Sequence, residues 1–199
     1  LKAEYESIDT DKELLIVKRN GKYGLYNKEG ENLIDSQYDK IKPLPNGVNV
    51  IVSIKEKSYI YCLLDKHLDK SPYTSIRQLD ENYLIVQSGE SYGLSDTHGE
   101  VRIPISFQGI DKLKKGYSEY HPSIFRCDLN GKVGAYSIID KRIVIATEFD
   151  NIEWWNQIVF KVKMGFKWGL YEIGKGYLTE IKYDSISPYN NTKITVSSN

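Results

Sequence analysis

One short pattern recurs along the whole chain and constrains the fold more than any other feature. The pattern is aromatic-x-x-Ile, and successive copies lie 33, 35, 34, 42 and 34 residues apart. The six copies begin at Tyr5, Tyr38, Tyr73, Phe107, Phe149 and Tyr183. A repeat of this length cannot bury a core of its own, so neighbouring repeats must pack on one another.

A second marker, a bulky residue followed by glycine, lies between the copies of the first. Its four copies are Tyr23-Gly24, Tyr92-Gly93, Val133-Gly134 and Trp168-Gly169, and the remaining repeat has Tyr59-Ile60 in that place. Glycine inside a strand weakens packing, so its recurrence predicts a backbone that bends, bulges or approaches another segment too closely for a Cβ atom. The repeat that contains Ile60 is then expected to be locally distorted.

The segments around these markers have the pattern of short strands. Runs of four or five β-branched or aromatic residues, such as Leu14 to Lys18, are followed by turns such as Asn20-Gly21 and Asn130-Gly131. Asn-Gly between two apolar runs is typical of a two-residue hairpin. We therefore predict an all-β fold of about five three-stranded antiparallel repeats of roughly 35 residues, with half-units at both ends.

The numbers of the two markers bear on whether the array is open or closed. A closed ring uses each marker once per blade, whereas this chain has six copies of the first marker and five places for the second. This favours an open, twisted array, with a five-bladed β-propeller-like ring as the alternative. The expected single repeat domain spans residues 1–199, with a half-unit at 1–18 and repeats at about 19–52, 53–87, 88–127, 128–162 and 163–199.

Composition narrows the classes of partner. The chain has 27 basic and 27 acidic residues and a pI of about 7.0, which argues against a dedicated nucleic-acid-binding protein. No apolar run approaches the roughly 18 residues of a membrane span, so none is expected. The chain starts at Leu1 without an initiator Met or a signal peptide, so we expect a trimmed start. Cys62 and Cys127 are expected to pack as small hydrophobic residues, although one disulfide stays open as an alternative.

Three stretches identify a family resemblance. Gly-Lys-Tyr-Gly-Leu-Tyr (21–26), Gly-Lys-Val-Gly-Ala-Tyr (131–136) and Phe-Lys-Trp-Gly-Leu-Tyr (166–171), each with an aromatic-Asp-x-Ile downstream, resemble the WG-repeat (Trp-Gly) family. Only Trp168-Gly169 keeps the Trp-Gly pair, which makes the chain a divergent member. The resemblance implies a β-rich repeat module of bacterial proteins, often surface-exposed or secreted, with no shared activity and no catalytic residues to carry over.

The sequence contains no motif of a catalytic or metal site. Nucleophile-elbow, phosphate-loop and His-Glu-x-x-His motifs are absent, and the three histidines lack the spacing of metal ligands. We therefore expect no enzyme activity, no cofactor and no metal. Asp39, Asp150 and Asp184 recur at one position of the repeat, so we expect them to accept backbone hydrogen bonds in turns rather than to act as general acids.

The largest departure from the repeat lies between Ile110 and Val133, where seven or eight residues are added relative to most other repeats. The added residues include Tyr117, Tyr120 and His121. Tyrosine offers a large rigid contact surface with a polar tip, so this extra loop suits recognition of a partner. The alternative is a tolerated surface insertion whose tyrosines fold back on the sheet.

Trp154 is a second departure. The other repeats place turn-forming or exposed residues at its position, whereas the neighbouring position, occupied by Trp155, is mostly apolar. Trp154 is therefore predicted to be an exposed aromatic anchor, and Trp155 to be a core residue. The alternative for Trp154 is a ring that lies flat over a neighbouring strand.

These observations favour a non-enzymatic protein-binding repeat module, such as an adaptor, a surface protein or an immunity-type protein. Its expected binding residues are Trp154, Tyr117, Tyr120 and His121. The alternative is a glycan-binding surface module, in which exposed aromatic rings stack on sugars.

Overall fold

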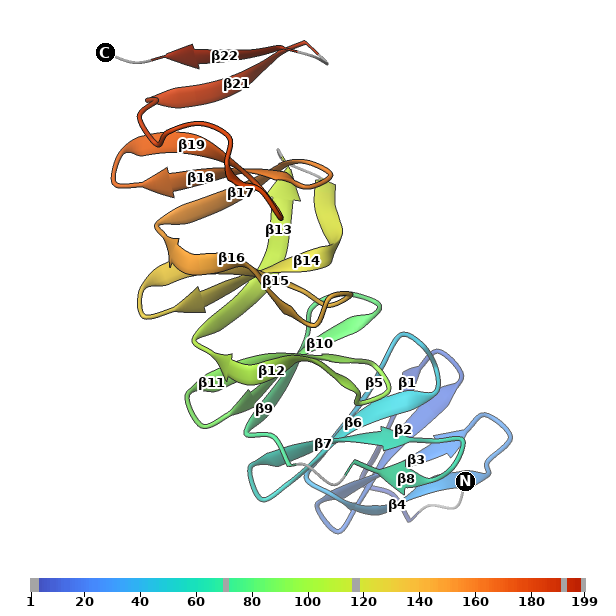
Figure 1. The fold of residues 1–199 in the computed structure, drawn as a ribbon. Coiled ribbons are helices and arrows are strands. Elements are labelled where there is room, and N and C mark those ends of the chain that lie inside the picture. The colour runs from blue at the N-terminus through green and yellow to red at the C-terminus, as the bar shows by residue number, and fades with distance from the viewer. Residues whose placement is uncertain (1–3, 70–71, 116–118, 191–192, 198–199) are drawn as a thin grey trace. The chain divides into compact units, whose positions relative to one another are not determined.

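The computed structural model describes residues 4–69, 72–115, 119–190 and 193–197, and this part of the chain is all-β without a helix (Figure 1). Its strands form five four-stranded antiparallel sheets in tandem and a final two-stranded sheet. The chain divides into two compact units, residues 1–101 and 102–199. Among the described residues, none belongs to a helix long and apolar enough to cross a membrane.

Within each sheet the strands are neighbours in the order of the sequence. The first sheet contains β1 (Ser7–Asp11), β2 (Leu14–Arg19), β3 (Lys22–Asn27) and β4 (Asn32–Tyr38). The second contains β5 (Lys40–Pro43), β6 (Asn49–Ile54), β7 (Lys57–Cys62) and β8 (His67–Leu68). The third contains β9 (Ser75–Gln78), β10 (Tyr83–Ser88), β11 (Ser91–Asp96) and β12 (Val101–Phe107).

The remaining sheets repeat this arrangement. The fourth contains β13 (Gly109–Lys115), β14 (Glu119–Leu129), β15 (Lys132–Ser137) and β16 (Arg142–Phe149). The fifth contains β17 (Asn151–Asn156), β18 (Val159–Met164), β19 (Lys167–Glu172) and β20 (Gly176–Tyr177). The last is the pair β21 (Ser185–Asn190) and β22 (Lys193–Ser197).

The expected all-β tandem array is confirmed, and each sheet is open. Each of the five sheets has four strands rather than the expected three, because the aromatic-x-x-Ile marker contributes to two sheets. Tyr38 ends β4, whereas Ile41 lies in β5 of the next sheet. The expected N-terminal half-unit is consequently the first half of a complete sheet, and β21 with β22 forms a half at the other end.

The Asn-Gly hairpins form as predicted. Asn20 and Gly21 have φ values of 51° and 73°, and Asn130 and Gly131 have values of 53° and 73°. Two successive residues with positive φ match the right-handed twist of the flanking strands, which is why Asn-Gly is favoured there.

The glycine of the second marker lies where the fourth strand of the same sheet crosses the third. A Cβ atom on Gly134 would lie 2.6 Å from the carbonyl oxygen of Ile145, and one on Gly24 would lie 2.8 Å from that of Ile34. The pairing register shifts at both places, as predicted. The second sheet, which has Ile60 instead, has a fourth strand of only two residues, but β20 of the fifth sheet, which has Gly169, is equally short. Glycine alone therefore does not set the length of the fourth strand.

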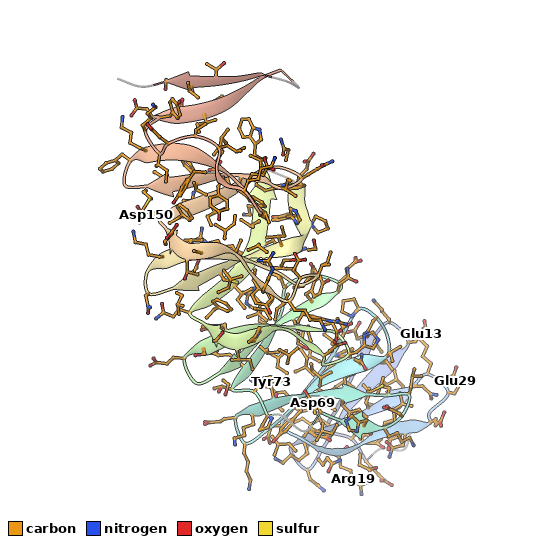
Figure 2. All side chains as sticks on the ribbon, viewed as in Figure 1. Glu13, Arg19, Glu29, Asp69, Tyr73 and Asp150 are labelled. Atoms are coloured by element: carbon orange, nitrogen blue, oxygen red, sulfur yellow. The ribbon has the colours of Figure 1, made fainter. Side chains whose placement is uncertain are left out.

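The residue after the marker aromatic caps a hairpin turn of the next sheet. Asp39 accepts a hydrogen bond from the backbone N–H of Lys55 at 2.8 Å, and Asp150, labelled in Figure 2, accepts one from Gly165 at 2.6 Å. Each capping residue accepts a hydrogen bond from the turn between the second and third strands of the sheet that follows it, and these residues are Glu6, Asp39, Thr74, Gln108 and Asp150. The structural role expected for Asp39 and Asp150 is confirmed.

An ion pair accompanies the cap where the capping residue is aspartate. Lys22 donates to Asp39, and Lys132 donates to Asp150 at 2.5 Å. These lysines immediately precede the second marker of the preceding sheet. The hydrogen bonds that these lysines donate lower the pKa of both carboxyls below the usual value. The hydrogen bonds from the backbone N–H groups of the capped turns are the second cause. Asp184 accepts from Lys167 in the same way at 2.5 Å.

The cores lie between successive sheets of the same unit. In the N-terminal unit, Leu25 and Ile34 of the first sheet form one cluster with Val50 and Val52 of the second. In the C-terminal unit, the fourth and fifth sheets share a cluster that includes Ile145, Phe149, Phe160 and Val162. Each sheet thus depends on a neighbour for its burial, as the repeat length requires.

Candidate binding site

The insertion between Ile110 and Val133, which the sequence predicts to be an extra loop, adds paired residues to β13 and β14. After a register shift at Lys112, Lys114 pairs with Tyr120 and Lys115 with Glu119. β14 is consequently 11 residues long. We call the added pairing residues, 114, 115 and 119–121, the hairpin arm. Tyr117 lies outside the described residues.

Tyr120 is an exposed residue of the arm, with 43% of its surface accessible. The Nζ atoms of Lys112 and Lys114 lie 5.3 and 5.8 Å from the centre of its ring. Cations at this distance are attracted to the negative face of the ring. The tyrosine therefore does not fold back as an apolar core residue but forms an aromatic and cationic surface with the two lysines.

His121 anchors the base of the arm. Its Nδ1 accepts hydrogen bonds from the backbone N–H groups of Ser123 and Ile124 at 3.3 and 3.0 Å, and its Nε2 lies 3.2 Å from the carbonyl oxygen of Gln157. Two donors at Nδ1 and an acceptor at Nε2 require the neutral ring with its proton on Nε2. Burial lowers the pKa of His121, and the Gln157 carbonyl opposes this effect only in part.

Trp154 is half-buried and packs against the core cluster shared by the fourth and fifth sheets, so the predicted exposure of its ring is wrong. Its ring meets that of His121 edge to face, with the ring centres 4.9 Å apart. The reason is the added arm, which places the ring of His121 against Trp154, at a position that turn-forming or polar residues occupy in the other repeats. Trp155 is also only half-buried, with the Nζ of Lys161 5.8 Å from the centre of its ring.

A further departure from the repeat, in addition to the insertion and Trp154, occurs at Arg126 in β14. In every sheet, the residue after the marker Ile pairs with one residue of the second strand, and these partners form a column across the repeats. The column contains Ile16, Ile51, Ile85, Arg126, Lys161 and Thr195. Three isoleucines in the N-terminal unit are thus replaced by hydrophilic residues in the C-terminal unit.

Arg126 lies beside a groove of about 710 Å³ between β13 and β17, the first strands of the fourth and fifth sheets. The groove is lined by residues 109–114 of β13, by Arg126 and Asp128 of β14, and by residues 151–153 of β17. Its volume falls in the range of sites for small ligands or short peptide segments. Lys112 and Lys114 belong both to this lining and to the surface around Tyr120.

Two side chains hold the guanidinium of Arg126 in place. Its Nε donates to Asp128 at 2.8 Å, and its Nη1 donates to the side-chain oxygen of Asn151 at 3.1 Å. Gly109 leaves room for this arrangement, because a Cβ atom there would lie 2.8 Å from a carboxylate oxygen of Asp128. The other repeats place Ser7, Lys40, Ser75, Asn151 and Ser185 at the position of Gly109.

The acidic residues of the groove are engaged. Asp128 pairs with Arg126, Glu153 pairs with Lys161, and Asp111 accepts a hydrogen bond from the backbone N–H of Lys112 at 2.8 Å. With Lys161 included, four cations stand against three carboxylates in and around the groove. The groove therefore favours an acidic ligand.

The structure thus brings two groups of residues together at the arm: Tyr120 with Lys112 and Lys114, and His121 with Trp154. The groove and Arg126 are features that the sequence reasoning missed. The signal was present, because aligning the second strands of the repeats places Arg126 among isoleucines.

The described residues contain no cluster of three or more His, Cys, Asp or Glu side chains that could hold a metal ion. Both cysteines are free, with Cys127 buried in β14 and Cys62 half-buried in β7. Burial raises the pKa of the Cys127 thiol to about 12, so this thiol is not an activated nucleophile.

Two segments of the chain, residues 23–57 and 92–119, match the family model of the WG containing repeat. No curated protein sequence matches the chain. Among solved structures, Hsv2 of Kluyvelomyces marxianus is 16% identical, with a TM-score of 0.33, over 85% of this chain and 58% of that one. Hsv2p of Kluyveromyces lactis is 13% identical, with a TM-score of 0.31, over 84% of this chain and 74% of that one.

This chain spans less than two thirds of the Kluyvelomyces marxianus chain, and at such TM-scores the likeness bears on neither fold nor function. The matched segments begin at Tyr23 and Tyr92, the bulky residues of the second marker, and so agree with the repeat found in the sequence. Two segments of the chain are thus similar to the WG containing repeat.

Proposed function

We propose that this chain is a non-enzymatic protein-binding module, of the adaptor, surface or immunity type, whose binding surface is the hairpin arm with the adjoining groove. One observation carries the proposal: the largest insertion in the repeat lengthens the paired strands β13 and β14 and places exposed Tyr120 beside lysines that line a groove. Exposed aromatic residues at the rim of a concave surface are frequent anchors of protein interfaces.

The proposal is tested by quantitative capture from a lysate of the source organism. Wild-type protein is compared with Tyr120→Ala, which removes the exposed ring of the arm, and with Phe166→Ala, which removes a ring that is 89% exposed in the β18–β19 turn. We expect one or more proteins whose capture falls at least fivefold with Tyr120→Ala and is unchanged with Phe166→Ala. Equal recovery by all three proteins would contradict the proposed surface.

A glycan-binding module is the second candidate, and Tyr120 supports it, because an exposed ring can stack on a sugar. Half-burial of Trp154 weighs against it, because less of the indole face is open for stacking than the sequence predicts. Glycan binding at this site requires signal on a glycan array that Tyr120→Ala abolishes.

A further inference from the structure

We propose that the groove between β13 and β17 binds an extended acidic segment of the partner protein, with Arg126 receiving one of its carboxylates. This inference rests on the proposed protein-binding function and names the chemistry of the partner. It starts from the position of Arg126, which replaces an isoleucine of the N-terminal unit in the same column of the repeat.

Arg126 is prepared to bind a carboxylate. Two of its five N–H donors bind Asp128 and Asn151, which fixes the orientation of the guanidinium plane. Donors remain for a ligand in the groove, and the planar guanidinium matches a carboxylate in geometry as well as in charge. A side chain at position 109 would displace Asp128 from its place beside Arg126. The equivalent position is glycine in this repeat and in none of the others.

The shape of the groove favours an extended segment. Six consecutive residues of β13, Gly109 to Lys114, line it, and β13 is the terminal strand of its sheet. The outer backbone groups of a terminal strand can pair with an added strand, which is a common mode of peptide recognition. Six residues of extended chain span about 20 Å, which sets the length of the expected segment.

The charges around the groove select which segment can bind. Lysines on a terminal strand disfavour indiscriminate pairing with other strands. Lys112 and Lys114 carry this charge on β13, so a segment with carboxylates on its groove-facing side is favoured over a neutral one.

The test uses fluorescein-labelled peptides and fluorescence anisotropy with the full chain at low salt. The first peptide is the blocked hexapeptide Val-Glu-Val-Glu-Val-Glu, and the second is the same peptide with Gln in place of each Glu. We expect the acidic peptide to bind at least tenfold more tightly than the neutral one. Equal binding of the two peptides, or no binding of the acidic peptide, would overturn the inference.

Variants locate the binding. Arg126→Ile restores the residue of the N-terminal repeats and is expected to weaken binding of the acidic peptide at least tenfold, with Arg126→Gln as a second variant of similar effect. Gly109→Ser, which restores the residue of three other repeats and displaces Asp128, is expected to weaken it about threefold without any change of charge. Arg19→Gln, which removes a half-exposed arginine of the N-terminal unit, is the matched control and is expected to leave binding unchanged.

The remaining outcomes separate the alternatives. If Arg19→Gln weakens binding as much as Arg126→Ile does, the attraction is non-specific and the inference is wrong. If free glutarate competes as well as the unlabelled acidic peptide, the site takes small carboxylates, and the extended segment is overturned. A result in which no peptide binds while capture still depends on Tyr120 would reject the acidic segment and leave the proposed protein-binding function intact.

Discussion

The layer between the first and second sheets and the layer between the fourth and fifth sheets use the same scaffold but differ in one column. Both are crossed by an aspartate that caps a hairpin turn and pairs with a lysine, Asp39 in the first case and Asp150 in the second. The column residue is Ile16 in the first layer, where it packs against the apolar cluster, and Arg126 in the second, where it lines a groove.

This difference shows which positions of the repeat are free to vary. Glycine and the capping residue are constrained by backbone atoms that lie within 3 Å, so their roles recur in both units. The column residue is constrained only by what it packs against in the next sheet. A repeat protein of this kind can therefore place a polar site in one layer without altering the backbone that builds the others.

The largest effect is expected when the column of the N-terminal unit is given the residue of the C-terminal unit. Ile51 is 6% exposed, packs with Leu44, Ile60 and Leu84, and pairs across the strand with Lys42. Ile51→Arg would bury a cation opposite another cation, whereas Arg126 pairs across the strand with Asp111. We expect a loss of about 4 kcal/mol in the free energy of unfolding, measured by urea denaturation.

The reverse change is the control. Arg126→Ile exchanges a polar residue for the apolar one that the repeat favours and is expected to leave stability unchanged or to raise it by about 1 kcal/mol. If Ile51→Arg lowers the free energy of unfolding by less than about 1 kcal/mol, the column residue does not account for the difference between the two layers.

Glycine substitutions test the part of the scaffold that the two layers share. Gly134→Ala and Gly24→Ala place a Cβ atom within 3 Å of backbone atoms of the fourth strand, and each is expected to cost about 3 kcal/mol. Gly169→Ala first meets a side-chain atom of Ile181 at 2.9 Å, which can move, and should cost about 1 kcal/mol. Urea denaturation of the three variants gives the order of their losses in the free energy of unfolding. Equal losses would show that close backbone approach is not the reason why glycine recurs at this position.

The sequence predicts the parts of the fold that depend on local chemistry. The Asn-Gly turns, the close approach at Gly24 and Gly134, and the capping role of Asp39 and Asp150 each follow from the residue type and its period. The fourth strand is missed because its segment, such as Asn32–Tyr38, carries no turn or apolar signal that separates a paired strand from a linker.

The candidate site is predicted less completely, because it depends on which residues meet across strands. Tyr120 and His121 are found from the insertion, yet only the pairing of β13 with β14 shows that they belong to a strand. Trp154 is mistaken for an exposed residue because the arm that covers it comes from another sheet. Arg126 was accessible to sequence reasoning, because its column lies eight residues before the glycine of the second marker, at Ile16, Ile85, Arg126 and Lys161.

The loss of folding stability at acid pH should come in part from the aspartate caps Asp39 and Asp150 in both layers. We expect this loss to be smaller than the loss caused by the glycine substitutions. The pKa of Asp39 and Asp150 is lowered in the folded state, so the stability they contribute is present above their unfolded pKa near 4 and is lost as pH falls through the lowered value. We expect the double variant Asp39→Asn/Asp150→Asn to lose less stability than wild-type protein between pH 5 and about pH 2.5 in urea denaturation. Parallel losses in the two proteins would rule out the caps as the source of the acid sensitivity.

The smallest expected effect is confined to the C-terminal unit, where His121 joins the arm to the β17–β18 turn. The pKa of His121 is lowered by burial, so its neutral form stabilises the folded state above the unfolded pKa of about 6.5. Below that pH the unfolded chain takes up the proton first, and the contribution declines as pH falls through the lowered value. Protonation at Nδ1 would also oppose the N–H groups of Ser123 and Ile124.

Long-range ¹H–¹⁵N correlation spectra of the imidazole should show the Nε2–H tautomer at pH 7.5 and a midpoint for His121 below 6.5. Because the ring is partly open to solvent, the accompanying change in stability is expected to be small. It should appear as a lower urea midpoint at pH 5.5 than at pH 7.5 that is reduced in His121→Gln, a variant in which the other two histidines still titrate. A midpoint above 6.5, or the Nδ1–H tautomer, would show that the arm is not held by the neutral histidine, and the two layers would then differ only in their column residue.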